Sequence, residues 1–114
     1  MPPTHAGLPP EDAVHLFAAL GDDVRLSIVG NLSDRGPQSI TELARHAPIS
    51  RQAITKHLHV LESAGIATSE RSGRERIWRL QAHRLTTAQR YLDRISSRWD
   101  DAIARLEAHL QEPA

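Results

Sequence analysis

The segment spanning residues 50–80 constrains this chain most, because a helical pattern in it ends at a glycine and gives way to two short extended runs. Ile54, Leu58 and Leu61 recur at spacings of four and three, which places them on one face of an amphipathic helix. Gly65 supplies the stop, since glycine readily adopts the left-handed conformation that ends many helices. The segment therefore predicts a helix with one apolar face, followed at once by extended structure.

The extended structure is predicted to be a β-hairpin. Residues 66–70 and 75–80 have the composition of two strands, and Ser72 and Gly73 form a tight turn between them, where glycine tolerates a positive φ. Side chains two residues apart on a strand share a face. The hairpin is therefore predicted to present a cationic edge and tip, made by Arg71, Arg74, Arg76 and Arg79.

Three further helices are predicted before this unit. The first covers residues 11–20, and the second begins after Asp22, whose carboxylate is a favourable N-cap. The residues expected to be buried in these two helices are Val14, Phe17, Leu20, Leu26, Ile28, Val29 and Leu32. A short third helix begins at about Thr41, its expected cap, and a break at Pro48 separates it from the helix that Ser50 caps. Two helices joined by so tight a turn form a helix-turn-helix arrangement.

Length and composition narrow the class of protein. The 114 residues fit one domain, predicted over residues 11–110 between tails at 1–10 and 111–114. The absence of cysteine excludes disulfides, thiolate metal sites and thiol nucleophiles. No signal-peptide pattern or membrane-spanning apolar run is present, so a cytoplasmic protein is expected. No catalytic spacing or glycine-rich phosphate loop indicates an enzyme, and no cofactor is expected.

Charge is unevenly distributed, although the formal net charge is zero. Residues 1–44 carry two basic and six acidic side chains, whereas residues 45–79 carry seven basic and three acidic ones. Residues 80–114 carry five of each. A local field, rather than net charge, steers a polyanion toward a protein. The basic helix and hairpin are therefore the expected contact surface for nucleic acid.

The basic helix and hairpin are expected to contact double-stranded DNA through nine side chains. These are Ser50, Arg51, Gln52, Thr55, Lys56, His59, Arg71, Arg74 and Arg76. Arg51 and Gln52 lie in the first helical turn, where guanine and adenine are their respective bidentate partners, and the sequence does not decide which of the two reads a base. The hydroxyls and the lysine suit phosphates, and Arg74 at the hairpin tip suits the minor groove or its phosphates. The alternative is a solvated helix face beside a solubilising edge of arginines.

A long final helix is predicted from about Leu85 to Leu110, with apolar residues at spacings of three, four and seven. Such a helix is longer than one small domain can cover, so part of its apolar stripe is expected to meet a second copy of the chain. The expected dimer interface consists of Val14, Phe17, Leu92, Ile95, Trp99, Ile103, Leu106 and Leu110.

Taken in order, these features resemble the ArsR family of winged helix-turn-helix transcriptional repressors. The resemblance spans about residues 13–80 and rests on residues 18–28, 40–44, 52–66 and 73–75. It implies a mainly α fold with a small β-hairpin, in the order α-α-α-α-β-β-α. It also implies a homodimer built on the first and last helices, which binds a palindromic operator and blocks transcription.

Many family members sense metals, through cysteines on the third helix or through Asp and His ligands on the last helix. Here residues 41–46 contain no thiol, and Asp93 is followed two positions later by Ile95 in place of a histidine. The chain therefore resembles the branch that lacks metal sites. His57 and His59 point in different directions from one helix, so we expect a packed His57 and a DNA-facing His59.

Three alternatives remain open from the sequence. The first is a repressor gated by a small molecule, whose pocket lies between the first and last helices at the dimer interface. The second is a metal sensor whose histidines meet across the dimer. The third is a winged-helix module whose arginines dock on an acidic protein surface.

Overall fold

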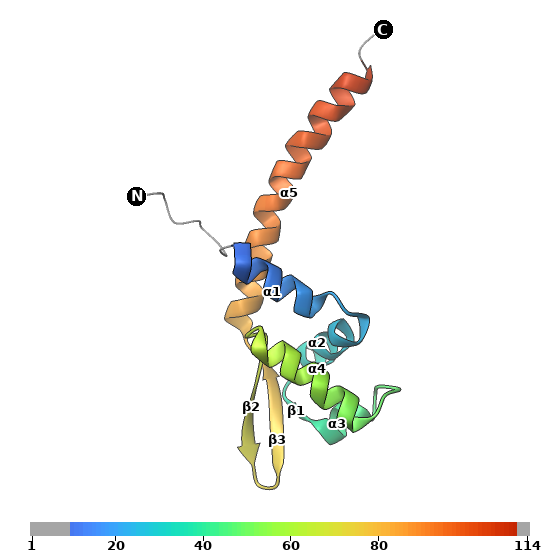
Figure 1. Cartoon of the computed structure of the whole chain (residues 1–114), viewed down its shortest axis with the longest axis vertical. Coiled ribbons are helices and arrows are strands. Elements are labelled where there is room, and N and C mark those ends of the chain that lie inside the picture. Colours follow the sequence, from blue (N-terminus) through green and yellow to red (C-terminus); the bar gives the residue numbers. More distant parts are fainter. Residues whose placement is uncertain (1–9, 112–114) are drawn as a thin grey trace, which may run out of the picture.

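The computed structural model describes residues 10–111, and its elements follow the predicted order with one additional strand (Figure 1). The helices are α1 (Pro10–Leu20), α2 (Asp23–Arg35), α3 (Ile40–Ala44), α4 (Arg51–Ser63) and α5 (Ala82–Gln111). The strands β1 (Gln38–Ser39), β2 (Ala67–Ser72) and β3 (Glu75–Leu80) form an antiparallel sheet in the order β1-β3-β2. The mainly α fold with a small hairpin is thus confirmed. The predicted tails lie outside the described residues, except that residues 10 and 111 belong to α1 and α5.

Side-chain caps set where the helices begin. Asp22 caps α2 and Ser50 caps α4, as predicted, each accepting a hydrogen bond from the backbone amide three residues on, at 3.0 and 3.1 Å. The predicted cap of α3, Thr41, is wrong. Ser39 caps this helix, because its hydroxyl accepts from the Glu42 amide while the Glu42 carboxylate accepts from the Ser39 amide. This capping box satisfies two backbone amides at once, which a lone threonine does not.

The core lies between the first four helices and the sheet. Its fully buried large side chains are Leu16, Leu43, Ile54, Leu58, Leu61, Ile66 and Trp78. The predicted apolar face of α4 is therefore confirmed. Two predicted core residues are wrong, since Val14 and Leu26 are 68% and 53% exposed. Helix α1 instead buries Leu16 between Ala13 and Ala19, a stripe that small side chains make inconspicuous in the sequence.

The hairpin and α5 leave the body in opposite directions (Figure 1). Gly65 and Gly73 adopt φ angles of +77° and +64°, which confirms the predicted helix stop and hairpin turn. Within residues 10–111, no residue beyond Ala88 is buried, and no helix is long and apolar enough to cross a membrane. Beyond Ile95, nearly all side chains of α5 up to Gln111 are exposed.

Candidate nucleic-acid interface

Helix α4 separates core residues from polar ones around its circumference. Ile54, Leu58 and Leu61 have no exposed surface. The predicted contact residues Arg51, Gln52, Lys56 and His59 are exposed, as is the cap Ser50. The core anchors this helix from Ile54 to Leu61, so the backbone that carries the polar side chains is tied to the core. A rigid helix with an outward polar face is what docking into a major groove requires.

The two hydroxyls predicted to contact phosphate differ in what they can offer. Ser50 Oγ accepts from the Ala53 amide at 3.1 Å, so its own proton remains free to be donated. Thr55 Oγ1 donates to the Arg51 carbonyl at 2.8 Å and is half-buried. Thr55 must therefore break a hydrogen bond within the helix before it can donate to a phosphate, whereas Ser50 need not.

The hairpin concentrates positive charge at its tip. Arg71 lies directly opposite Arg76 in the register of β2 and β3, and Arg74 follows Gly73 in the turn. Like charges opposed on one face of a sheet are destabilising, and an anion placed between them removes the repulsion. Arg76 also donates to Ser69 Oγ at 3.2 Å. Among the described residues, neither Arg71 nor Arg74 forms an ion pair. The tip thus carries three exposed arginines without a carboxylate partner among the described residues.

One aromatic contact joins the helix to the hairpin. The His59 ring meets the Trp78 ring edge-on, with centroids 5.8 Å apart. His59 Nδ1 also lies 3.3 Å from a Glu62 carboxylate oxygen. Trp78 is 1% exposed and belongs to the core. His59 is exposed, and its ring also contacts the hairpin through Trp78.

A cluster behind α4, which sequence reasoning missed, holds this helix against α1 and α2. The Arg25 guanidinium donates to the Ala19 carbonyl at 2.6 Å and lies 3.2 Å from His57 Nδ1. Asp22 lies 3.9 Å from the same imidazole nitrogen. The packed position predicted for His57 is confirmed. Its partner Arg25 comes from 32 residues earlier in the chain, and no periodicity within one helix indicates a contact of that range.

The capping hydrogen bond at the start of α2 perturbs one acid in this cluster. Acceptance of the Arg25 backbone amide lowers the pKa of Asp22 below its ordinary value. Desolvation opposes this shift, and the positive charges of Arg25 and His57 reinforce it. Asp22 is therefore held as a carboxylate beside α4.

The predicted dimer surface is largely uncovered in the single chain. Six of its eight residues are exposed, from 48% for Ile103 to 77% for Leu110. The other two, Phe17 and Ile95, are half-buried, and Phe17 packs on Tyr91 with ring centroids 5.9 Å apart. An apolar face this long is unusual on a soluble monomer and is typical of an interface. Among residues 10–111, no group of three acidic or histidine side chains is placed to hold a metal ion.

Known proteins share both the sequence and the architecture. A family model described as a helix-turn-helix domain matches residues 20–70. The HTH-type transcriptional repressor SmtB of Mycobacterium tuberculosis is 35% identical over 105 residues, which cover 89% of this chain and 76% of that protein. The arsenical resistance operon repressor of Escherichia coli is 30% identical, covering 70% of this chain and 68% of that one. The structure of an ArsR-like transcriptional regulator from Rhodococcus sp. RHA1 is 36% identical with a TM-score of 0.73, covering 92% and 97% of the two chains.

Proposed function

This chain belongs to the ArsR family of winged helix-turn-helix transcriptional repressors, and we propose that it binds a palindromic operator as a homodimer and represses transcription without requiring a metal ion. The observation that carries this proposal is the pairing of two surfaces. One is the polar face of α4 with the arginine-tipped hairpin, and the other is the uncovered apolar stripe of α5. The first suits DNA and the second suits a second copy of the chain.

The DNA-contacting residues divide into two roles. Arg51 and Gln52, at the exposed start of α4, read base edges in the major groove. Arg74 at the hairpin tip, flanked by Arg71 and Arg76, holds phosphates or the minor groove and acts on all sequences alike. Two copies of α4 in a dimer would lie in successive major grooves, about 34 Å apart, so the operator is an imperfect palindrome.

The dimer is formed by α1 and α5 of each copy. Val14 on α1 is exposed although its neighbours Ala13 and Leu16 are buried, so it is free to contact a partner. Along α5, the exposed large side chains continue this surface: Leu92, Trp99, Ile103, Leu106 and Leu110. Burial of aromatic and aliphatic side chains of this size is the main source of stability in homodimers.

Independence from metals is supported by the donor groups that the chain offers. It has no cysteine, so the thiolate sites that select soft metals cannot be built from its side chains. On α5, Ile95 occupies the position where a histidine would complete a site with Asp93. The E. coli relative is named for arsenical resistance, but this chain lacks the soft ligands with which to bind such an ion.

Selection of bound duplexes from a random DNA pool, followed by gel-shift titration at two salt concentrations, tests the proposal. We expect an inverted repeat to be enriched, and affinity to fall steeply with salt. Gln52→Ala should relax the preference at one position in each half-site, at a cost of roughly 1–3 kcal/mol, whereas the exposed Gln89→Ala on α5 should not. Binding without any sequence preference, or no binding, would favour a protein-docking module. Enrichment of a single half-site, without a repeat, would contradict the dimer.

A further inference from the structure

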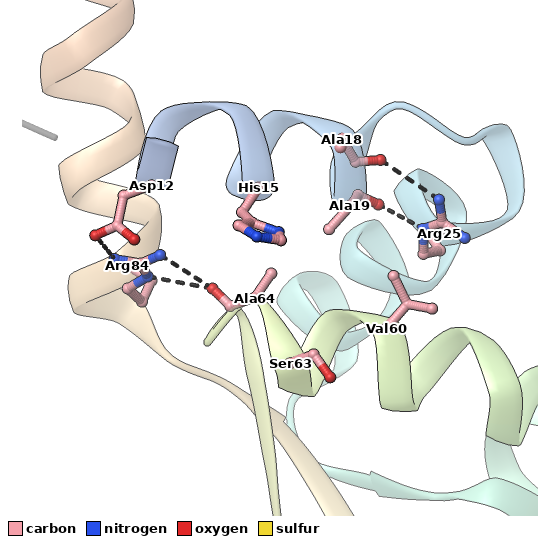
Figure 2. Close-up of a pocket in the computed structure, with 9 residues that line it drawn as sticks. All are labelled: Asp12, His15, Ala18, Ala19, Arg25, Val60, Ser63, Ala64 and Arg84. Atoms are coloured by element: carbon pink, nitrogen blue, oxygen red, sulfur yellow. Dashed lines mark hydrogen bonds and ion pairs between the residues drawn. The ribbon is translucent and has the colours of Figure 1, made fainter. Parts of the chain in front are cut away.

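An open groove of about 380 Å³ lies where α1, α4 and the start of α5 meet (Figure 2). Its walls carry the charged side chains Asp12, Arg25 and Arg84, with His15 between them. Ala18 of α1 also lines it and, on the opposite side, so do Val60 of α4 and the C-cap residue Ala64. None of these residues belongs to the DNA-contacting surface proposed above. This volume is at the lower end of the range found for small-molecule sites.

The Arg84 guanidinium, at one end of this groove, is held by hydrogen bonds to the protein backbone. Its Nε and Nη2 donate to the single carbonyl of Ala64, at 3.3 and 3.1 Å. The side chain reaches that carbonyl because Gly65 has no Cβ, which would stand only 3.1 Å from Arg84 Nε. Among the described residues, the one ion pair of Arg84 is with Asp12, whose carboxylate lies 3.8 Å from Nη1 and is half exposed. Arg84 therefore has a fixed position and a weakly held counter-charge.

The edge of Arg84 that faces Ala64 is the edge that best fits a carboxylate. Nε and Nη2 together bind two carboxylate oxygens in parallel, and such a bidentate pair joins two opposite charges, whereas a carbonyl offers one neutral oxygen. In the present structure this fork is shared by one neutral oxygen. We propose that the groove binds a small organic carboxylate, which takes the Nε–Nη2 fork of Arg84 from the Ala64 carbonyl and competes with Asp12, on the Nη1 side, as the counter-charge of Arg84.

The rest of the groove limits what that ligand can be. His15 points from α1 into the space between Arg84 and Val60, where it can hydrogen-bond a polar group (Figure 2). The Arg25 guanidinium closes the far end, but the Ala18 and Ala19 carbonyls and His57 already engage its nitrogens. One strong anion site next to an alanine-lined and valine-lined wall fits a monocarboxylate with a short apolar body.

A ligand in the groove would break the hydrogen bonds that connect the end of α4 to α5. Ala64 is the C-terminal cap of α4, so the Arg84 bonds tie the end of this helix to α5. A ligand that removes these bonds loosens α4 relative to the dimer helices and weakens operator binding, and DNA reciprocally weakens the ligand. This regulatory step rests on the proposed function, whereas ligand binding itself does not.

Ligand binding is tested first without DNA. Butyrate, hexanoate and benzoate are titrated into the full chain in the millimolar range, each beside its uncharged amide and at constant ionic strength. We expect saturable NMR shifts of the Ser63, Ala64 and Gly65 amides with the carboxylates only. Equal binding of the amides would overturn the anion site. So would the absence of binding, or shifts confined to the arginines of the hairpin.

Two variants probe the groove from opposite directions. Asp12→Asn removes the competing carboxylate from an exposed position and should tighten carboxylate binding by about threefold, whereas Asp34→Asn, the matched control on α2, should not. Arg84→Met should abolish binding. If Arg84→Met fails to fold, the Asp12→Asn variant still tests the proposal, because unchanged affinity in that variant would overturn the competition between the ligand and Asp12 for Arg84.

Coupling is then measured on the selected operator duplex. A saturating carboxylate should weaken operator binding about tenfold, with no effect of its amide and none in a folded Arg84→Met. If carboxylates bind the groove but operator affinity is unchanged, the regulatory half of the proposal is overturned. If no operator is found, the proposed function fails, whereas the titration without DNA still tests whether the groove binds carboxylates.

Discussion

Residues 10–88 and the outer part of α5 use apolar side chains in opposite ways. In the first region, from Ala13 to Ala88, they fill a core that includes seven large and fully buried side chains. In the second region, residues 89–111, Leu92, Trp99 and Leu110 stand more than half exposed. The first region buries most of its large apolar side chains within one chain, with Val14 an exposed exception on the proposed dimer surface, and the second leaves most of its apolar side chains for a partner. Folding and assembly are therefore expected to respond to different substitutions.

Leu58→Ala should produce the largest effect and be confined to folding. Leu58 is fully buried at the centre of α4, so truncation leaves a cavity and costs about 2–5 kcal/mol of unfolding free energy. Urea unfolding followed by circular dichroism measures this loss. Val60→Ala, two residues away on the exposed side of the same helix, is the control and should change stability by less than about 0.5 kcal/mol. Similar losses for both variants would mean that the burial pattern of α4 is wrong.

Trp99→Ala should affect assembly with little effect on the fold. An exposed tryptophan in the middle of an apolar stripe is a candidate hot spot, whose truncation costs roughly 2 kcal/mol, or about 30-fold in the dimer dissociation constant. Sedimentation equilibrium measures that constant, and circular dichroism should show unchanged helix content at equal oligomeric state. Ser97→Ala, on another face of α5, is the control. A wild-type chain that stays monomeric would contradict the assignment of the α5 stripe to a dimer interface.

Arg74→Ala should weaken DNA binding without touching either the core or the stripe. Removal of one phosphate contact should lower the slope of log affinity against log salt by about 0.9, equally for operator and random DNA. Arg105→Ala is the matched control, because Arg105 is also exposed but lies on the outer part of α5. DNA titrations of both variants at several salt concentrations measure the two slopes. An equal change of slope in both variants would show that DNA contact extends along α5.

The fold was predictable where signals are local, and the supporting contacts were not. Asp22, Ser50 and Gly65 mark boundaries through their own caps and backbone angles, so they can be recognised without a partner. Ser39 and Glu42 also carried a local signal, the capping-box spacing, which the choice of Thr41 overlooked.

The misplaced core residues and the missed contacts share a physical cause. Val14 and Leu26 lie on helices whose inward faces depend on how the helices pack together, and the alanines that α1 buries give little contrast in sequence. The contact of Arg25 with His57, and that of Arg84 with the Ala64 carbonyl, join residues 32 and 20 positions apart. Such contacts follow from tertiary packing, which periodicity along one element does not encode.

The smallest predicted effect is a loss of folding stability at acid pH, which involves Asp22 in residues 10–88. Because the folded pKa of Asp22 is lowered, its carboxylate contributes stability above its unfolded pKa, and this contribution is lost as pH falls through the folded pKa. Asp22→Asn keeps a good N-cap that does not titrate. Between about pH 5 and pH 3, the urea midpoint of the wild type should therefore fall more than that of the variant.

The dimer dissociation constant should show no such difference, since Asp22 lies far from the α5 stripe in sequence and belongs to the packing around α4. Parallel falls in both proteins would contradict the lowered pKa, and a variant-specific change in dimerisation would couple two regions that the structure keeps apart.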